Sequence, residues 1–462
     1  MTDTHDTGPS LADLSPEWQR AFAWVEQELG GRVCRLRRQG RWRPAWFFDL
    51  EREDGTVLPL YFRGDRGWVE GQRVPCVLTH EWNLYRVMEA HGLPVPHVHG
   101  LCPEPRGLVM DRVPGRFNLA TVADPAERAG ILAHYIELLA GLHAIPVTEF
   151  EALGFERPAD SRALALGDFD AWVDNFRKAK RRPEPMLEFA LGWVYRNIPQ
   201  GRSDVACLQA DSGQFMFEDG RVTALIDMEL GYLGDPLADL GGLFCRDLGE
   251  PLGPIAPALA HYERVSGRHV DHDVVRFHAV RFNLCTPLVM AHFLAGAQLE
   301  VDHAMYQAWY IVWGRAALAG IAELMRIELP VLPAYRLHPT LRAPAFDTLV
   351  DMLGKLREAA GDDEGARYDI DKPWRLALAL QRADALAPAF DAIERDEIAA
   401  LLGRRVEDLA EANAALEELV MQSGPERDAE FLRYFLRRID REHELHRPAL
   451  HDYVDRVLQP IS

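Results

Sequence analysis

The spacing of hydrophobic residues changes along the chain, from alternation near the N-terminus to helical spacing over most of the remainder. Residues 32–50 and 56–63 alternate apolar and polar positions and carry many aromatic side chains, which predicts strands. Residues 15–29, 78–91 and 124–143 place apolar side chains three and four positions apart, which predicts amphipathic helices. The pattern therefore predicts a small strand-rich part followed by a mostly helical remainder.

Residues 205–239 combine a hairpin pattern with several acidic side chains. The Asp-Gly pair at 219–220 is a strong turn signal, and apolar residues lie on both sides of it. Counting outward from this turn pairs Gln214 with Leu225 and places Asp227 at the same end of the hairpin, because cross-strand partners share a face.

Three oxygen-bearing side chains, Asp211, Gln214 and Asp227, are thus expected near one another. Carboxylate and amide oxygens suit a hard cation such as Mg²⁺, which usually keeps some water and phosphate ligands. One carboxylate could instead act as a base towards a hydroxyl group. An Asp-capped hairpin with solvated acids is the structural alternative.

The order of these residues resembles the catalytic segment of aminoglycoside phosphotransferase-like, or choline-kinase-like, small-molecule kinases. The shared order is an Asp, a short loop, an amide residue, an Asp-Gly hairpin and the run I-D-x-E-x-x-x-x-G-D-P-x-x-D-L. The resemblance covers about residues 20–329. It implies ATP and Mg²⁺ as cofactors, with Asp211 as the catalytic base and with Gln214 and Asp227 as metal ligands.

The same resemblance assigns nucleotide-binding roles to the preceding strands. It implies that Arg63, on the third predicted strand, holds the nucleotide phosphates and pairs with Glu81 in the next helix. Backbone groups of residues 110–113, from Met110 to Val113, would bind the adenine. For Arg63 and Glu81, two unrelated surface charges are the alternative.

Six arginines lie within twelve residues of an otherwise acidic chain, and this cluster has two interpretations. A loop between the first two strands of a kinase-like fold covers the nucleotide phosphates, and guanidinium groups match phosphate oxygens. A solvated strand face is the alternative. The cluster comprises Arg32, Arg35, Arg37, Arg38, Arg41 and Arg43.

Composition narrows the class of protein. The 462 residues include 71 acidic and 51 basic side chains, and the net charge of −20 disfavours a nucleic-acid or anionic-membrane surface. No apolar run of about 18 residues and no signal-peptide pattern is present, so we expect a cytoplasmic protein that binds no membrane. The cysteines are scattered without metal-ligand spacing and are expected to be reduced: Cys34, Cys76, Cys102, Cys207, Cys245 and Cys285.

The predicted fold class is α+β, a bilobal protein-kinase-like fold with an additional helical domain. We expect a flexible tail at 1–14, a strand-rich N-lobe at 15–113 and a helical C-lobe at 114–329. A linker with four prolines at 330–344 would lead to a helical accessory domain at 345–462, which would serve a homodimer or a protein partner.

The expected activity is ATP- and Mg²⁺-dependent transfer of a phosphoryl group to a hydroxyl of a small metabolite. The alternative is a catalytically impaired kinase-like regulatory or scaffold protein. It is favoured by Gln209 and Ala210, which replace the family's His-Gly, by Gln214 in place of Asn, and by an N-lobe without a phosphate-binding lysine. His143 and Asp239 are expected to have structural roles.

Overall fold

The computed structural model describes residues 9–39, 43–65, 77–297, 299, 301–331, 333, 335–361 and 363–461, so Arg41 and Cys76 lie outside the described residues. By their internal contacts the described residues form two compact units. Unit 1 comprises the chain up to Gly167 together with Ser203–Asp239 and Pro251–Val270. Unit 2 comprises Asp168–Arg202, Leu240–Glu250 and the chain from Asp271 onward.

Unit 1 contains an antiparallel sheet of five strands in the order β1-β2-β3-β5-β4. The predicted strands at 32–50 and 56–63 correspond to β1, β2 and β3. The strands are β1 (Arg32–Arg38), β2 (Ala45–Glu51), β3 (Val57–Gly64), β4 (Val98–Pro103) and β5 (Arg106–Asp111). Strand β4 lies outside the stretches that were predicted to be strands.

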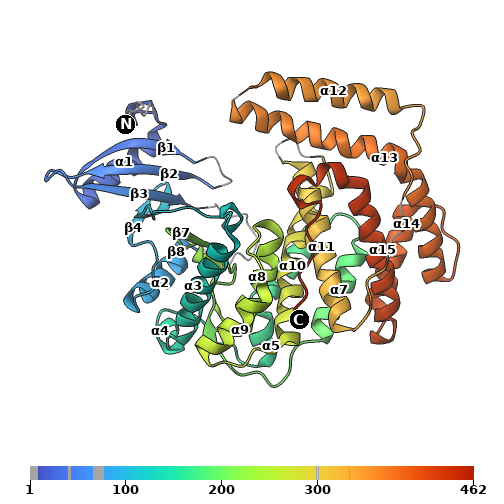
Figure 1. Ribbon diagram of the computed structural model, residues 1–462, viewed down its shortest axis with the longest axis horizontal. Coiled ribbons are helices and arrows are strands. Elements are labelled where there is room, and N and C mark those ends of the chain that lie inside the picture. The colour runs from blue at the N-terminus through green and yellow to red at the C-terminus, as the bar shows by residue number, and fades with distance from the viewer. Residues whose placement is uncertain are drawn as a thin grey trace. The chain divides into compact units, whose positions relative to one another are not determined.

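Helix α1 (Pro16–Leu29) lies beside this sheet (Figure 1). Its aromatic side chains share a hydrophobic core with those of the strands. The Phe22 ring centroid lies 5.8 Å from that of Trp46 in an edge-to-face contact, a geometry that aromatic pairs favour. Leu11 and Leu14 pack against the same core beside the short helix η1 (Leu11–Asp13). The predicted tail therefore contains an ordered turn, while its residues 1–8 lie outside the described residues.

The remaining elements of unit 1 include the β7–β8 hairpin and the helices around it. They are α2 (Leu78–Ala90), η2 (Leu119–Thr121), α3 (Pro125–Ala144), α4 (Val147–Glu151), α5 (Ser161–Leu166), β6 (Ala206–Cys207), β7 (Phe215–Glu218), β8 (Arg221–Leu225), η3 (Met228–Leu230), β9 (Leu233–Gly234) and α9 (Ile255–Ser266). Helix α8 (Pro236–Gly249) begins in unit 1 and continues in unit 2.

The hairpin formed by β7 and β8 differs from its predicted register. Phe217 faces Val222 as predicted, but Phe215, and not Gln214, faces Leu225. The prediction is wrong by one residue because the pairing shifts between Met216 and Phe217, which indicates a β-bulge. Gln214 instead accepts a hydrogen bond from the Ile226 N–H at 3.2 Å through its backbone carbonyl.

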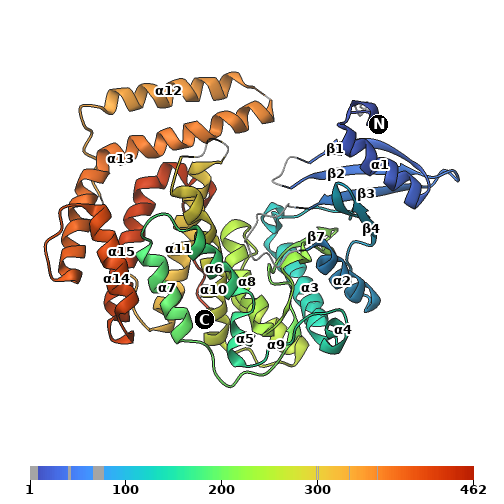
Figure 2. The same ribbon diagram turned by 180° about the vertical axis from the view of Figure 1, so that it is seen from behind.

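Unit 2 is built from helices, and α10 and α11 are packed side by side within it (Figures 1 and 2). Its helices are α6 (Phe169–Ala179), α7 (Pro185–Arg196), α10 (His272–Leu294), α11 (His303–Leu324), α12 (Ala343–Ala359), α13 (Glu364–Leu402), α14 (Leu409–Gln422) and α15 (Asp428–His446), with short turns η4 (Pro425–Arg427), η5 (Arg447–Ala449) and η6 (His451–Tyr453). Helix α11 packs against both α13 and α15. This packing crosses the proline-rich segment at 330–344, where the sequence predicted a boundary.

No helix among the described residues is long and apolar enough to span a bilayer.

Candidate active site

Arg63 and Glu81 form a buried ion pair. Strand β3 carries Arg63 and α2 carries Glu81, and the Arg63 Nε donates to a Glu81 carboxylate oxygen at 2.9 Å. Burial lowers the pKa of Arg63, but the negative charges of Glu81 and Asp227 raise it more, so the guanidinium stays charged. The two residues are 5% and 0% exposed, so the alternative of unrelated surface charges is wrong.

Asp227 joins this pair from the end of the hairpin. An Nη2 of Arg63 donates to its Oδ1, and the Asp227 side chain is 18% exposed. Asp227 has a left-handed backbone, with φ 60° and ψ 49°, which is uncommon for a residue other than glycine. Such local strain occurs mostly where the surrounding structure fixes a functional side chain.

Asp211 and Gln214 lie in the loop between β6 and β7 and contact each other. The Gln214 amide nitrogen donates to the Asp211 carboxylate. Its amide oxygen therefore faces away from the Asp211 carboxylate. The oxygen donors of Asp211, Gln214 and Asp227 match the preference of Mg²⁺, which needs only one or two protein carboxylates beside phosphates and water.

A protein-only metal cage is not seen. Among the described residues, the structure contains no group of three or more His, Cys, Asp or Glu side chains arranged to hold a metal ion.

Asp239 holds the loop that carries Asp211. Its carboxylate accepts hydrogen bonds from the backbone N–H groups of Gln209 and Ala210 and from the Ser212 hydroxyl, each at 2.8 Å. Asp239 is fully buried, so these bonds compensate the loss of water around its charge. The predicted structural role of Asp239 is therefore a specific one, the positioning of this loop.

His143 lies behind Asp239 and is buried, in agreement with a packed position at the end of a helix. Its Nε2 is 3.0 Å from an Asp239 carboxylate oxygen and its Nδ1 is 2.7 Å from the Tyr262 hydroxyl. Burial raises the pKa of the Tyr262 phenol above its ordinary value. His143 thus contacts the Asp239 carboxylate in addition to the groups of the loop.

Gln209, which stands where the resembling family has histidine, connects the loop to the hairpin. Its side-chain oxygen accepts from the Tyr135 hydroxyl at 2.6 Å, and its amide nitrogen donates to the carbonyls of Gln214 at 2.8 Å and Ile226 at 3.0 Å. Tyr135 also accepts from the Gly213 N–H at 2.7 Å. An amide can make these three bonds at once because it has both donors and an acceptor.

The predicted adenine-binding stretch begins in β5 and continues beyond its end. Met110 is buried within the sheet. The N–H groups of Asp111 and Arg112 donate to the carbonyls of His97 at 2.9 Å and Pro59 at 3.0 Å. An adenine would therefore have to use other backbone groups of the stretch, such as those of Val113.

The arginine cluster is divided between different environments. Arg32 pairs with Glu51 at 2.7 Å on the exposed face, and the guanidinium of Arg37 lies 4.5 Å from the Phe47 ring centroid. Arg43 is 2% exposed and donates to Glu229. Arg43 was considered only as a member of this cluster, and its pairing with Glu229 was not predicted, because nothing local in the sequence indicates that the two residues pair.

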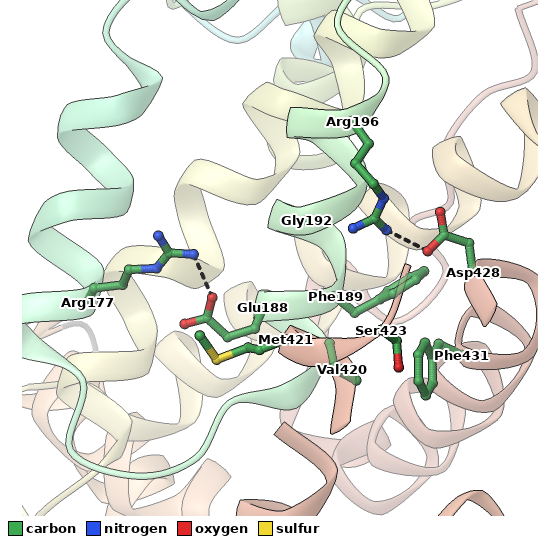
Figure 3. A pocket seen from close by; sticks show the side chains of 10 residues that line it. All are labelled: Arg177, Glu188, Phe189, Gly192, Arg196, Val420, Met421, Ser423, Asp428 and Phe431. Carbon is green, nitrogen blue, oxygen red and sulfur yellow. Dashed lines mark hydrogen bonds and ion pairs between the residues drawn. The ribbon is translucent and has the colours of Figure 1, made fainter. Parts of the chain in front are cut away.

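Unit 2 contains a separate pocket of about 130 Å³ between α7 and the α14–α15 segment (Figure 3). Phe189 and Phe431 form its apolar wall. Arg177 and Arg196 lie at its edge, and each already donates to a buried carboxylate of the same pocket, Glu188 at 2.8 Å and Asp428 at 2.5 Å (Figure 3). The pocket contains none of the predicted site residues.

Comparison with known proteins relates part of the chain to phosphotransferases. Residues 74–278 match the model of the phosphotransferase enzyme family, APH. Among curated proteins, the chain is 25% identical over 273 residues to acyl-CoA dehydrogenase family member 11 of Rattus norvegicus, which is 53% of this chain and 33% of that protein. The Homo sapiens protein of the same name is 25% identical over 260 residues, 51% of this chain and 32% of that protein. The chain thus spans about a third of the length of these relatives.

A solved structure supports the predicted fold class. A provisionally assigned aminoglycoside phosphotransferase from Ralstonia eutropha superposes with a TM-score of 0.51 at 18% sequence identity and covers 67% of this chain and 98% of its own. The α+β kinase-like fold, with additional C-terminal helices, is therefore confirmed. The match to the phosphotransferase enzyme family model covers the part of the chain that carries Glu81, Asp211 and Asp227.

Proposed function

We propose that the protein transfers the γ-phosphoryl group of ATP, in the presence of Mg²⁺, to a hydroxyl of a small molecule. The observation that carries this proposal is the contact of Arg63 with both Glu81 and Asp227. This contact brings together Arg63, a buried cation suited to phosphates, and Asp227, an acid suited to a metal ion. Asp227 follows the second strand of the β7–β8 hairpin, and Asp211 and Gln214 precede the first strand of the same hairpin.

Each predicted site residue has a role in this proposal. Arg63, fixed by Glu81, binds nucleotide phosphates, and Val113 contributes backbone groups to the adenine. Asp227 and Gln214 hold Mg²⁺, which when bound neutralises phosphate charge. Asp211 orients the acceptor hydroxyl and accepts its proton. Catalysis of this kind depends mainly on positioning and charge stabilisation, which the bonds from Asp239 and Gln209 provide.

An ATP-consumption screen over hydroxylated compounds tests the activity. The panel includes aminoglycosides and, because of the names of the curated relatives, hydroxyacyl-CoA thioesters. We expect one acceptor class to accelerate ATP consumption and Asp211→Asn to reduce the rate by roughly 10²-fold or more, because general-base catalysis contributes about that much. A rate that is unchanged in Asp211→Asn would refute the assigned role of Asp211.

A nucleotide-binding regulatory protein is the second candidate. The Gln214 amide that donates to Asp211 favours it, because an engaged carboxylate is a weaker base. Magnesium-dependent ATP binding without phosphoryl transfer to any compound of the panel would support this candidate over the enzyme.

A further inference from the structure

Arg43 is a buried arginine that reaches the turn behind Asp227. It precedes β2, and its Nη2 donates to Oε2 of Glu229 in η3. The two side chains are 1% and 8% exposed. A buried ion pair is weak evidence for stability, because the desolvation of two charges offsets most of their attraction. The Arg43–Glu229 pair is therefore better explained by a role in positioning the side chains near it than by a gain in stability.

Glu229 also contacts the proposed phosphate-binding cation. Its Oε2, which accepts from Arg43, lies 3.2 Å from Nη2 of Arg63. The same Nη2 donates to Asp227. Two carboxylates on one short turn thus share a single guanidinium nitrogen. Of the two, Asp227 is the more exposed, at 18% against 8%, and is the one that a cation from solution can reach.

The turn that carries Glu229 is held on its other side by α2. The Gly231 carbonyl lies 2.6 Å from the His80 Nε2, and the Met228 N–H faces the Tyr85 hydroxyl at 3.5 Å. A Cβ atom on Gly231 would come within 2.6 Å of Leu84. Glu229 therefore extends from a turn with little room to move, and the Arg43 contact fixes the end of its side chain.

The geometry points to Glu229 and Arg43 as a positioning pair that retains the Arg63 guanidinium at the phosphate site when Asp227 turns to bind a cation. This inference rests on the proposed function. Were Asp227 to bind a cation in place of Arg63, Glu81 would still hold the Nε of Arg63 and Glu229 would hold its Nη2. Arg43 keeps the Glu229 carboxylate from turning towards that cation. Nucleotide affinity should then depend on Glu229 and Arg43 specifically through the phosphate groups.

Dissociation constants for ATP and for adenosine, measured with Mg²⁺ by titration calorimetry, test this inference. We expect Glu229→Gln to weaken ATP binding by roughly tenfold or more, because it removes a charge-assisted contact to Arg63. Adenosine affinity should stay within about twofold, since adenosine carries no phosphate.

A double variant separates positioning from a merely structural role. Arg43→Met with Glu229→Gln removes both charges, so no buried charge is left unpaired and the fold should survive. We expect it to lose ATP affinity as Glu229→Gln does. Arg32→Ala is the control. It breaks the exposed ion pair of Arg32 with Glu51 at the start of β1, and it should bind ATP like the wild type.

Two results would overturn the inference in distinguishable ways. If the wild type binds ATP and the folded double variant binds it equally well, the pair is structural and the proposed function stands. If the wild type binds no nucleotide, the proposed function falls and the positioning role falls with it.

Discussion

At the scale of single residues, Asp239 is the buried charge on which the catalytic loop depends. It accepts hydrogen bonds from two backbone N–H groups and one hydroxyl, and His143 lies against it. Asp239→Asn would point an amide N–H₂ group at donors that need an acceptor. We expect the free energy of unfolding to fall by about 2 kcal/mol or more, because hydrogen bonds to charged groups are worth about that much. Urea unfolding measures the loss.

Asp235 provides the matched control for Asp239. Its carboxylate accepts from the Leu237 N–H at 3.0 Å at the start of α8. Asparagine caps helices about as well as aspartate, so Asp235→Asn should change stability by less than about 0.5 kcal/mol. Equal losses in the two variants would contradict the special role assigned to Asp239.

Sequence motifs predicted which residues form the site better than they predicted which residues those side chains contact. The family resemblance implied that Arg63 and Glu81 pair, and the structure places the Arg63 Nε 2.9 Å from a Glu81 carboxylate oxygen. The pairing of Arg43 with Glu229 joins positions 186 residues apart, and no local pattern carries that information. Long-range partners of this kind depend on how elements pack, which spacing along the chain does not determine.

At the scale of elements, the close approach of β3 and β5 positions Arg63. Gly107 faces Gly64 across these strands, and a Cβ atom on Gly107 would come within 2.2 Å of the Phe62 ring. Gly107→Ala must therefore displace the ring or separate the strands. We expect a loss of about 2 kcal/mol or more in unfolding free energy, within the range of overpacked cores. The unfolding temperature and the affinity for ATP should both decrease.

Gly130 in α3 serves as the control for Gly107. A Cβ atom there would meet nothing within 4 Å. Alanine in a helix interior is favoured over glycine by roughly 0.5–1 kcal/mol, so Gly130→Ala should stabilise the protein. A loss of stability at Gly130, or none at Gly107, would refute this account of the sheet.

A buried histidine in α15 gives unit 2 a predictable pH dependence. His443 is 6% exposed, and its Nε2 lies 2.9 Å from the Val454 carbonyl. Burial and the nearby charge of Arg315 lower the pKa of His443 to about 4, from an ordinary value of 6.5. Between these values the unfolded chain binds the proton and the folded chain does not, so stability rises with pH across this window.

His443→Gln tests this dependence, because it keeps a donor for the carbonyl and removes the titrating group. The free energy of unfolding of the wild type should fall by up to about 3 kcal/mol as the pH falls from 6.5 to 4. The variant lacks this titrating group, so its free energy of unfolding should fall by less over the same range. Chemical unfolding at several pH values measures both. Parallel curves for the two proteins would contradict the assignment.

The elements themselves were largely predictable, whereas their exact pairing was not. The alternating residues of β1 to β3 and the helical spacing of α1, α2 and α3 agree with the structure to within a few residues. The bulge in the β7–β8 hairpin was missed, because an Asp-Gly turn fixes only the pairs next to it.

At the scale of the whole molecule, the helices after residue 330 form a compact unit with helices that precede them. Helix α11 packs against α13 and α15, and Arg315 pairs with Asp440 at 2.6 Å. A chain cut after residue 329 would expose the apolar face of α11. We expect it to aggregate or to unfold at a clearly lower temperature than the full chain.

Expression and thermal unfolding of this shortened chain provide the measurement. The proline-rich segment at 330–344 indicated a boundary from composition alone, and composition does not show what packs across it. A shortened chain that stays monomeric and unfolds at the temperature of the full chain would favour an independent C-terminal domain.

The central claim is that the Arg63, Asp227 and Asp211 site binds ATP with Mg²⁺. Titration calorimetry of ATP, with and without Mg²⁺, on the wild type and on Asp227→Ala tests it most directly. We predict that Mg²⁺ strengthens ATP binding to the wild type and that this gain is lost in a folded Asp227→Ala variant. Binding that is absent in the wild type, or equally dependent on Mg²⁺ in the variant, would contradict the account.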